Sequence, residues 1–161
     1  MNSLEIEGIL TQNKWNIFKF LGCFAADELP IVSLNGTSTC FIANVDPSSE
    51  KGSHWVSFVI TKNGNLEYFC PLGISFYHWP LFVNYIRNIM SFNNILMNRK
   101  RIQSIGSNVC GIICMEFLIK RDRGMSFSLI LNSYSTINFL SNDLQSVNFI
   151  NDFKRKNNVI I

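Results

Sequence analysis

Apolar and polar residues alternate along parts of the chain with the two-residue period of β-strands. An apolar segment at residues 40–45 and alternating segments at 55–61 and 66–70 have this pattern. Asn63 and Gly64 separate the last two segments, and Asn-Gly between apolar runs is a strong signal for a β-hairpin. The pattern therefore predicts three strands, two of them joined by a tight turn.

Other segments have the spacing of helices, and they lie at residues 4–11, 82–97, 111–121 and 143–154. Ser3 is the expected N-cap of the first helix, and cations follow the third, as the helix dipole favours. Residues 101–104 are expected to form a short strand, and residues 22 and 25–30 are expected to be loop. This order predicts an α+β fold with a small central mixed sheet packed by helices. No repeat or linker divides the chain, so residues 1–161 are expected to form a single domain.

Composition excludes several classes of protein. Hydrophobic residues make up 47% of the 161 residues and charged residues 16%, which excludes a disordered chain. A net charge of +3 is too small for a polybasic nucleic-acid binder. The longest apolar run, around residues 110–119, is too short for a membrane span and contains Glu116. Glu5 and Glu7 stand where a signal peptide carries cations, so an intracellular, reducing location is expected.

Only two histidines and five cysteines are available for catalysis or metal binding, and the odd number of cysteines favours free thiols. His78, before Trp79 and Pro80, is expected to be a partly exposed aromatic cap. His54 follows a polar loop and opens the strand at 55–61, where a rigid sheet edge can present a general base to substrate.

Cys110 opens an apolar helix, where the positive end of the dipole favours the thiolate. A buried, inert cysteine is the alternative, and for Cys114, one turn further along, it is the preferred interpretation. Gly111 lets another chain approach closely. Gln103 precedes a turn that can return its amide to Cys110, where it would stabilise an oxyanion together with the Cys110 amide.

The motifs that carry these residues occur in a fixed order. They are Ser53-His54-Trp55, then Tyr68-Phe69-Cys70-Pro71-Leu72-Gly73, then Gln103 and Ser107-Asn108-Val109-Cys110-Gly111. Together they resemble adenain, the adenovirus maturation protease, with related proteases in virophages and Maverick-type elements, and more distantly the SUMO-specific proteases. The resemblance implies an α+β cysteine protease with Cys110 as nucleophile, His54 as base and Gln103 in the oxyanion hole. It also implies a narrow substrate channel, with Trp55 as one wall and Gly111 beside it.

Position 70 departs from that family, which has an acid before Pro-x-Gly to orient the histidine. Here the residue is Cys70, and Glu67 on the same strand is expected to point to the opposite face. Asp46 and Glu50, in the loop before His54, are candidate substitutes. Cys70 is left with three interpretations: a weak partner of His54, an inert core thiol, or a degenerate position.

The expected mode of activation also differs from that of adenain, which receives an activating peptide through a disulfide, because residues 91–102 contain no cysteine. No cofactor or metal is expected to be required, and a peptide or DNA activator stays an open alternative. Basic residues occur at 99–101, 120–123 and 154–156, either as a non-specific DNA surface or as solvated helix ends.

The expected function is that of a viral or virus-like cysteine endopeptidase. It would cleave capsid or scaffold precursors at Gly-containing sites during particle maturation, as a monomer in the virion and the infected cell, away from membranes. Two alternatives stay open: a protease for ubiquitin-like modifiers that end in Gly-Gly, and a catalytically inactive relative that serves as a binding or assembly module.

Overall fold

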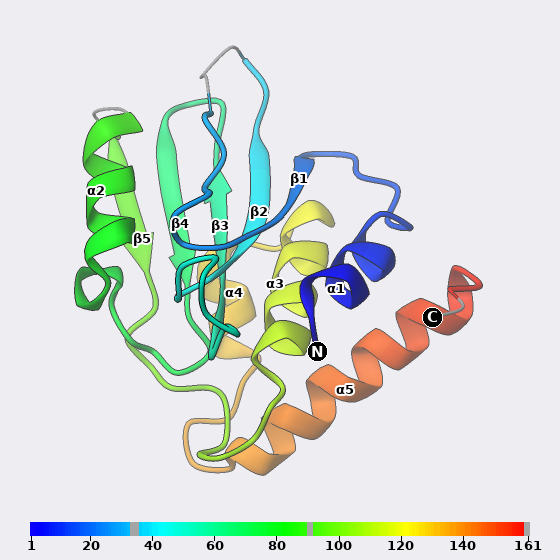
Figure 1. The fold of residues 1–161 in the computed structure, drawn as a ribbon. Helices are drawn as coiled ribbons and strands as arrows, with labels where there is room; N and C mark the ends of the chain where they lie inside the picture. The colour runs from blue at the N-terminus through cyan, green and yellow to red at the C-terminus, as the bar shows by residue number, and fades with distance from the viewer. Residues whose placement is uncertain (33–35, 90–91, 160–161) are drawn as a thin grey trace.

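A five-stranded mixed sheet forms the centre of the molecule, with its strands in chain order from β1 to β5 (Figure 1). The computed structural model describes residues 1–32, 36–89 and 92–159. The strands are β1 (Lys19–Phe24), β2 (Thr39–Asn44), β3 (Trp55–Ile60), β4 (Asn65–Phe69) and β5 (Asn94–Met97). The outer pairs β1–β2 and β4–β5 are parallel, and the inner pairs are antiparallel.

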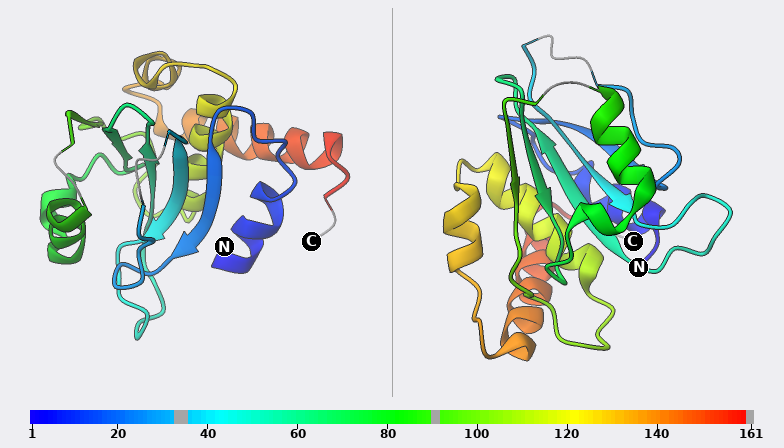
Figure 2. Two further views of the ribbon diagram at one scale, coloured as in Figure 1. Left: turned by 90° about the horizontal axis from the view of Figure 1, so that it is seen from above. Right: turned by 90° about the vertical axis from the view of Figure 1, so that its left-hand side faces the viewer.

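Helices cover both faces of the sheet (Figure 2). They are α1 (Ser3–Leu10), a 3₁₀ turn η1 (Phe76–His78), α2 (Pro80–Ile89), α3 (Cys110–Asp122), α4 (Phe127–Asn132) and α5 (Phe139–Lys156). One face packs against α1, α3, α4 and α5, and the other packs against η1 and α2. The expected α+β fold class, a mixed sheet packed by helices, is therefore confirmed.

The side chains of β2 alternate between two hydrophobic cores, one on each face of the sheet. Cys40 and Ile42 belong to the core under α3, whereas Phe41 and Ala43 belong to the core under α2. Every residue of β2 is buried. Because neither face of this strand meets solvent, its central residues 40–43 are all apolar rather than alternating with polar residues.

The predicted hairpin at β3 and β4 is confirmed, but the helix predicted at 82–97 is wrong over residues 94–97. Residues 94–97 form β5, which pairs in parallel with β4, so sheet pairing overrides the local helical spacing. Residues 90 and 91 lie outside the described residues. The strand predicted at 101–104 is also wrong, because the N–H groups of Ile102 and Gln103 both bind the Pro71 carbonyl rather than a neighbouring strand.

The sequence analysis missed β1, η1 and α4, and each of the four helices that it predicted begins earlier in the structure than expected. Gly22, expected in a loop, lies inside β1 at a shift in strand register, with a φ of 123° that few other residues adopt. Helix α1 is capped by Asn2 instead of Ser3, through a capping box with Glu5. Helix α5 begins at Phe139 instead of residue 143, after the N-cap Asn138.

Asp122, at the end of α3, binds the segment at residues 16–18 that leads into β1. Its carboxylate is 2% exposed and accepts hydrogen bonds from the backbone N–H groups of Asn16, Ile17 and Phe18 at 2.8–3.1 Å. The side chain of Asn13 donates a further bond at 3.3 Å. The loop between α1 and β1 is therefore held by one buried charge on α3.

We expect Asp122→Ala to lower the free energy of unfolding by about 2–4 kcal/mol, because it removes a charged acceptor from several buried N–H groups. Asp152→Ala, at an exposed carboxylate, is the matched control and should change it by about 0.5 kcal/mol or less. Chemical denaturation of both variants measures the difference, and equal losses would contradict the role given to Asp122.

Candidate active site

His54 lies directly before β3, where the sheet fixes its backbone. Its carbonyl accepts the N–H of Val45 at 3.0 Å, and its side chain is 8% exposed. Its Nε2 lies 3.3 Å from the Cys70 sulfur. The ring also stacks at 6.5 Å, centroid to centroid, on Trp79. Backbone pairing, a ring and a thiol thus hold the imidazole in one orientation.

Burial controls the charge of His54. Removal from water lowers its pKa to about 4, and the carboxylate of Asp46 opposes this shift only in part. At neutral pH the imidazole is therefore neutral, which is the form that can accept a proton.

Cys70 follows β4 and is fully buried. Burial raises the pKa of its thiol, while the backbone N–H groups of Ile74 and Leu72 act in the opposite direction. The 3.3 Å contact with His54 favours the interpretation of Cys70 as a partner of the histidine over that of an isolated core thiol. N–H groups around the sulfur make the position suited to an anion, although the residue present is a neutral thiol at neutral pH.

The candidate substitutes for an orienting acid lie elsewhere. Glu67 points to the other face, as expected, and forms a two-pronged ion pair with Arg121, with both N–O distances at 2.7 Å. Asp46 accepts the N–H of Ser53 at 2.5 Å and acts on His54 through its charge. Glu50 is exposed on the same loop.

Cys110 is the first residue of α3 and is 8% exposed. The N-cap position is Val109, whose side chain forms no capping hydrogen bond. The first backbone N–H groups of α3 are therefore free of a side-chain cap, and they point toward the helix entrance where an anion is favoured.

Helix α3 packs closely against β3 just beyond Cys110 and His54. A Cβ atom on Gly111 would lie 3.3 Å from Cδ1 of Trp55 and 3.0 Å from Cδ1 of Ile6. Gly111 is thus buried, and the chain that approaches it closely is the protein's own. Because Gly111 follows Cys110 and Trp55 follows His54, this packing brings the start of α3 to the start of β3.

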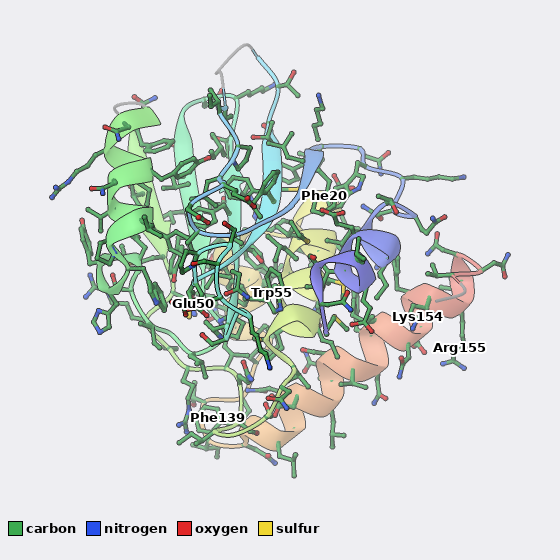
Figure 3. The ribbon with its side chains drawn as sticks, in the orientation of Figure 1. Phe20, Glu50, Trp55, Phe139, Lys154 and Arg155 are labelled. Carbon is green, nitrogen blue, oxygen red and sulfur yellow. The ribbon has the colours of Figure 1, made fainter. Side chains whose placement is uncertain are left out.

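Trp55 also lines a cavity of about 360 Å³ between the start of α1, the end of β1 and the loop at 46–52. Its indole Nε1 donates to the carbonyl of Met1 at 3.3 Å. The side chain lies at the start of α3, next to α1 (Figure 3). Trp55 thus forms a wall between this cavity and the helix, and the cavity is not lined by His54, Gln103 or Cys110, so the expected role of Trp55 in a substrate channel stays a prediction.

Gln103 is 3% exposed and sits in the turn that leads to α3. Its side-chain Nε2 donates to the carbonyl of Ser107 at 2.6 Å, and its Oε1 has no partner in the described part of the chain. An amide NH₂ carries two hydrogens, so one stays available after this bond. The turn does fold the amide back along the segment that ends at Cys110.

Cys114 is buried, as expected, but it also links helix and strand. Its sulfur donates to the carbonyl of Trp55, and the hydroxyl of Ser57 donates to the carbonyl of Cys114, both at 3.3 Å. The sequence analysis did not single out Ser57. A lone serine inside an otherwise apolar buried strand is the signal that could have identified it.

Several of the basic residues form ion pairs or cation–π contacts within the protein. Lys120 pairs with buried Glu116 at 2.6 Å, and Arg121 pairs with Glu67. The guanidinium of Arg101 lies 4.1 Å from the ring centroid of Phe139, at the opposite end of α5 from Arg155 (Figure 3). The three basic clusters therefore do not form one continuous surface.

His78 is exposed at the end of η1, before α2. All five cysteines have free thiols. Within residues 1–32, 36–89 and 92–159, no group of three or more His, Cys, Asp or Glu side chains could hold a metal ion. None of the helices described there is long and apolar enough to cross a membrane.

Comparison with known proteins identifies the fold class. The chain resembles ChlaDUB1, an effector protein of Chlamydia trachomatis, with a TM-score of 0.57 and 14% identity over 99% of this chain and 73% of that one. It resembles the ASFV pS273R protease with a TM-score of 0.51 and 17% identity, over 80% of this chain and 59% of that one. The central domain of an uncharacterized Legionella pneumophila protein matches with a TM-score of 0.55 and 9% identity, over 95% and 98%.

Such low identities establish a shared fold and nothing more specific. No protein-family model matches the chain, and no curated protein matches it. This chain spans less than two thirds of the ASFV protease. The fold is therefore a mixed α+β fold that this chain shares with ChlaDUB1 and the ASFV pS273R protease, which agrees with the fold class that the motifs imply. Membership of the adenain family is a proposal.

We predict that Cys70→Asp folds and raises the pKa of His54 from about 4, because a carboxylate at this position stabilises the imidazolium. The new charge would meet the N–H groups of Leu72 and Ile74 as well as His54, so it is not left unpaired. NMR titration of His54 and a thermal melt measure both effects. Cys70→Ser is the control that changes the atom without adding charge. A folded Cys70→Asp variant with an unshifted His54 would show that position 70 does not act on the histidine.

Proposed function

We propose that this protein is a cysteine endopeptidase in which Cys110 is the nucleophile and His54 the base. The observation that carries the proposal is the orientation of His54. Its Nε2 contacts the Cys70 sulfur, which leaves Nδ1 as the ring nitrogen that could serve Cys110. Trp55, the residue after His54, packs against Gly111, the residue after Cys110. This arrangement supports the assignment of Cys110 as nucleophile, His54 as base and Cys70 as the group that orients the base.

In the first step, the Cys110 sulfur attacks the carbonyl carbon of the scissile peptide bond. His54 Nδ1 takes the thiol proton, the carbonyl oxygen becomes an oxyanion, and the imidazolium then gives the proton to the leaving amine as the C–N bond breaks. Water, with His54 again as base, cleaves the thioester and restores the thiol. The pKa of about 4 means that His54 enters this cycle neutral and ready to accept a proton.

The oxyanion is stabilised by two donors. One is the backbone N–H of Cys110, at the uncapped start of α3, and the other is the remaining side-chain N–H of Gln103. Both donors are built on fixed backbone, so little reorganisation is required when charge develops.

Cys70 takes the place of the acid that orients the histidine. For His54 to act as a base toward Cys110, Nε2 must carry the hydrogen and donate it to the Cys70 sulfur. A neutral thiol accepts this bond more weakly than a carboxylate, and it does not stabilise the imidazolium by charge. The proposed enzyme therefore uses a neutral thiol–imidazole pair rather than a strongly stabilised ion pair.

The natural substrate in this proposal is a capsid or scaffold precursor of a virus or virus-like element, cut at a Gly-containing site. The order of the His-Trp, Pro-x-Gly, Gln and Cys-Gly motifs supports it. The ASFV protease, with the same fold, is a viral protease. No cofactor is required, and the internal pairing of Lys120 and Arg121 argues against the cluster at 120–123 as a DNA contact.

A protease for ubiquitin-like modifiers is the second candidate, because substrates that end in Gly-Gly would fit the same narrow channel. Incubation with candidate capsid precursors and with modifier precursors, followed by mass spectrometry of the new ends, separates the two. If neither class is cut and Cys110 alkylation does not depend on His54, the protein is an inactive binding module.

We predict that Cys110→Ala abolishes cleavage and leaves the fold intact. Cys114→Ala should retain activity in the folded fraction but lower the free energy of unfolding by about 1–3 kcal/mol, because it removes a buried side chain and its hydrogen bond. Peptide turnover and thermal melts of the two variants provide the comparison. Turnover by folded Cys110→Ala would disprove the assignment of the nucleophile.

Gln103→Ala should lower kcat by about 10²–10³-fold with little change in KM, which is the usual cost of one missing oxyanion donor. Steady-state kinetics on a peptide substrate measures both constants. Ser107→Ala keeps the backbone carbonyl that Gln103 binds and serves as the control. A change confined to KM would instead assign Gln103 to substrate binding.

A further inference from the structure

Asn98 is a fully buried amide that makes three hydrogen bonds to backbone groups, two of them to Cys70. It follows β5 directly and is 1% exposed. Its Oδ1 accepts the N–H of Cys70 at 2.8 Å, and its Nδ2 donates to the carbonyl of Cys70 at 2.7 Å and to the carbonyl of Lys100 at 3.1 Å. One side chain thus binds both backbone polar groups of the residue that contacts His54.

The place of Asn98 in the sheet explains why an amide is needed there. The parallel pairing of β4 and β5 ends at Tyr68 opposite Met97, and the two chains then separate. Beyond that point the Asn98 side chain supplies the donor and the acceptor that a neighbouring strand would otherwise supply. The segment that carries Cys70 therefore stays in register after the ladder has ended.

The same segment also holds the backbone of Gln103. The Pro71 carbonyl accepts the N–H of Ile102 at 2.8 Å and that of Gln103 at 3.0 Å. A Cβ atom on Gly73 would lie 2.7 Å from the backbone carbon of Lys100, and its φ of +68° favours glycine. The turn at 70–73 and the segment at 100–103 therefore pack backbone against backbone, with Asn98 bound to both.

We propose that Asn98 is a positioning residue that aligns Cys70 with His54 and Gln103 with the oxyanion at the same time. The inference rests on the proposed function, because it assigns a common support to two of its catalytic groups. Loss of the amide would free the Cys70 backbone, weaken the contact of its sulfur with His54 Nε2, and loosen the segment that leads to Gln103. One substitution would therefore affect both Cys70 and Gln103, which lie far apart in the sequence.

The state of His54 provides a readout that does not depend on proteolysis. The groups that face this histidine are the Cys70 sulfur from the turn after β4, the Asp46 carboxylate from the loop before β3, and the Trp79 ring from the segment before α2. In the proposed function the thiol of Cys110, at the start of α3, faces its other ring nitrogen. When the Cys70 segment loosens, water reaches the imidazole and the burial that lowers its pKa is reduced. Its pKa should then rise from about 4 toward the ordinary value for histidine.

The test compares two variants at this position with a control. Asn98→Ala removes all three hydrogen bonds, and Asn98→Asp keeps the acceptor for the Cys70 N–H but replaces the donor with an oxygen. Tyr134→Phe is the control, since it removes one buried hydrogen bond, to Glu116, on the side of α3 that faces α5. Its thermal stability should fall without an effect on the site.

For each folded variant, NMR titration gives the pKa of His54, with the signal of exposed His78 as an internal reference, and iodoacetamide gives the rate of Cys110 alkylation against pH. We expect both Asn98 variants to raise the His54 pKa by about one unit or more and to lower kcat on a cleaved peptide by about 10- to 100-fold at unchanged KM. Tyr134→Phe should move none of these values.

An unchanged His54 pKa and alkylation profile in a folded Asn98 variant would overturn the proposal. If Asn98→Ala does not fold, the neutral variant Asn98→Ser carries the test, because the carboxylate of Asn98→Asp would raise the pKa of His54 by its charge alone. If the wild-type protein cleaves no peptide, the proposed function fails, but the titration and alkylation experiments still decide whether Asn98 positions the pair.

Discussion

The contact between the first turn of α3 and the first residues of β3 is the constraint on which the rest of the site depends. Gly111 has no side chain, so the helix can approach Trp55, and two hydrogen bonds at Cys114 then fix the helix along the strand. Cys110 and His54 each stand one residue before this contact. Their relative position is thus set by buried packing, where small displacements are costly.

At position 70, a thiol in place of a carboxylate changes the charge of the site. The N–H groups around the sulfur would suit a carboxylate, and the histidine is placed to receive one. With a thiol there, nothing compensates for the burial of His54 except the charge of Asp46, and its pKa falls to about 4. The contact between His54 and position 70 is retained, but the imidazole is held neutral. Under the proposed function, the reactivity of Cys110 would therefore depend on proton transfer during the reaction rather than on a preformed ion pair.

Buried charges anchor the middle and the end of α3. Glu116 binds Lys120, Tyr134 and Ser146, which joins α3 to the helices on its outer side. Arg121 binds Glu67 on β4, and Asp122 holds the loop before β1. Lys120 and Arg121 thus serve the fold, because each pairs with a buried carboxylate.

The sequence by itself determined the elements whose signals are local. The Asn-Gly hairpin, the apolar strand β2, the buried helix after Cys110 and the order of the site motifs all follow from neighbouring residues, and they sufficed for the fold class and for the choice of His54, Cys110 and Gln103 as candidates. Only the tertiary structure decided that residues 94–97 join the sheet, that Gly111 packs against Trp55, and that Cys70 faces His54. It alone revealed Asn98 and Ser57, because an asparagine or a serine is informative only when its partners, distant in the sequence, are known. Local patterns encode periodicity, whereas the hydrogen bonds that align a catalytic group are made between segments far apart in the chain.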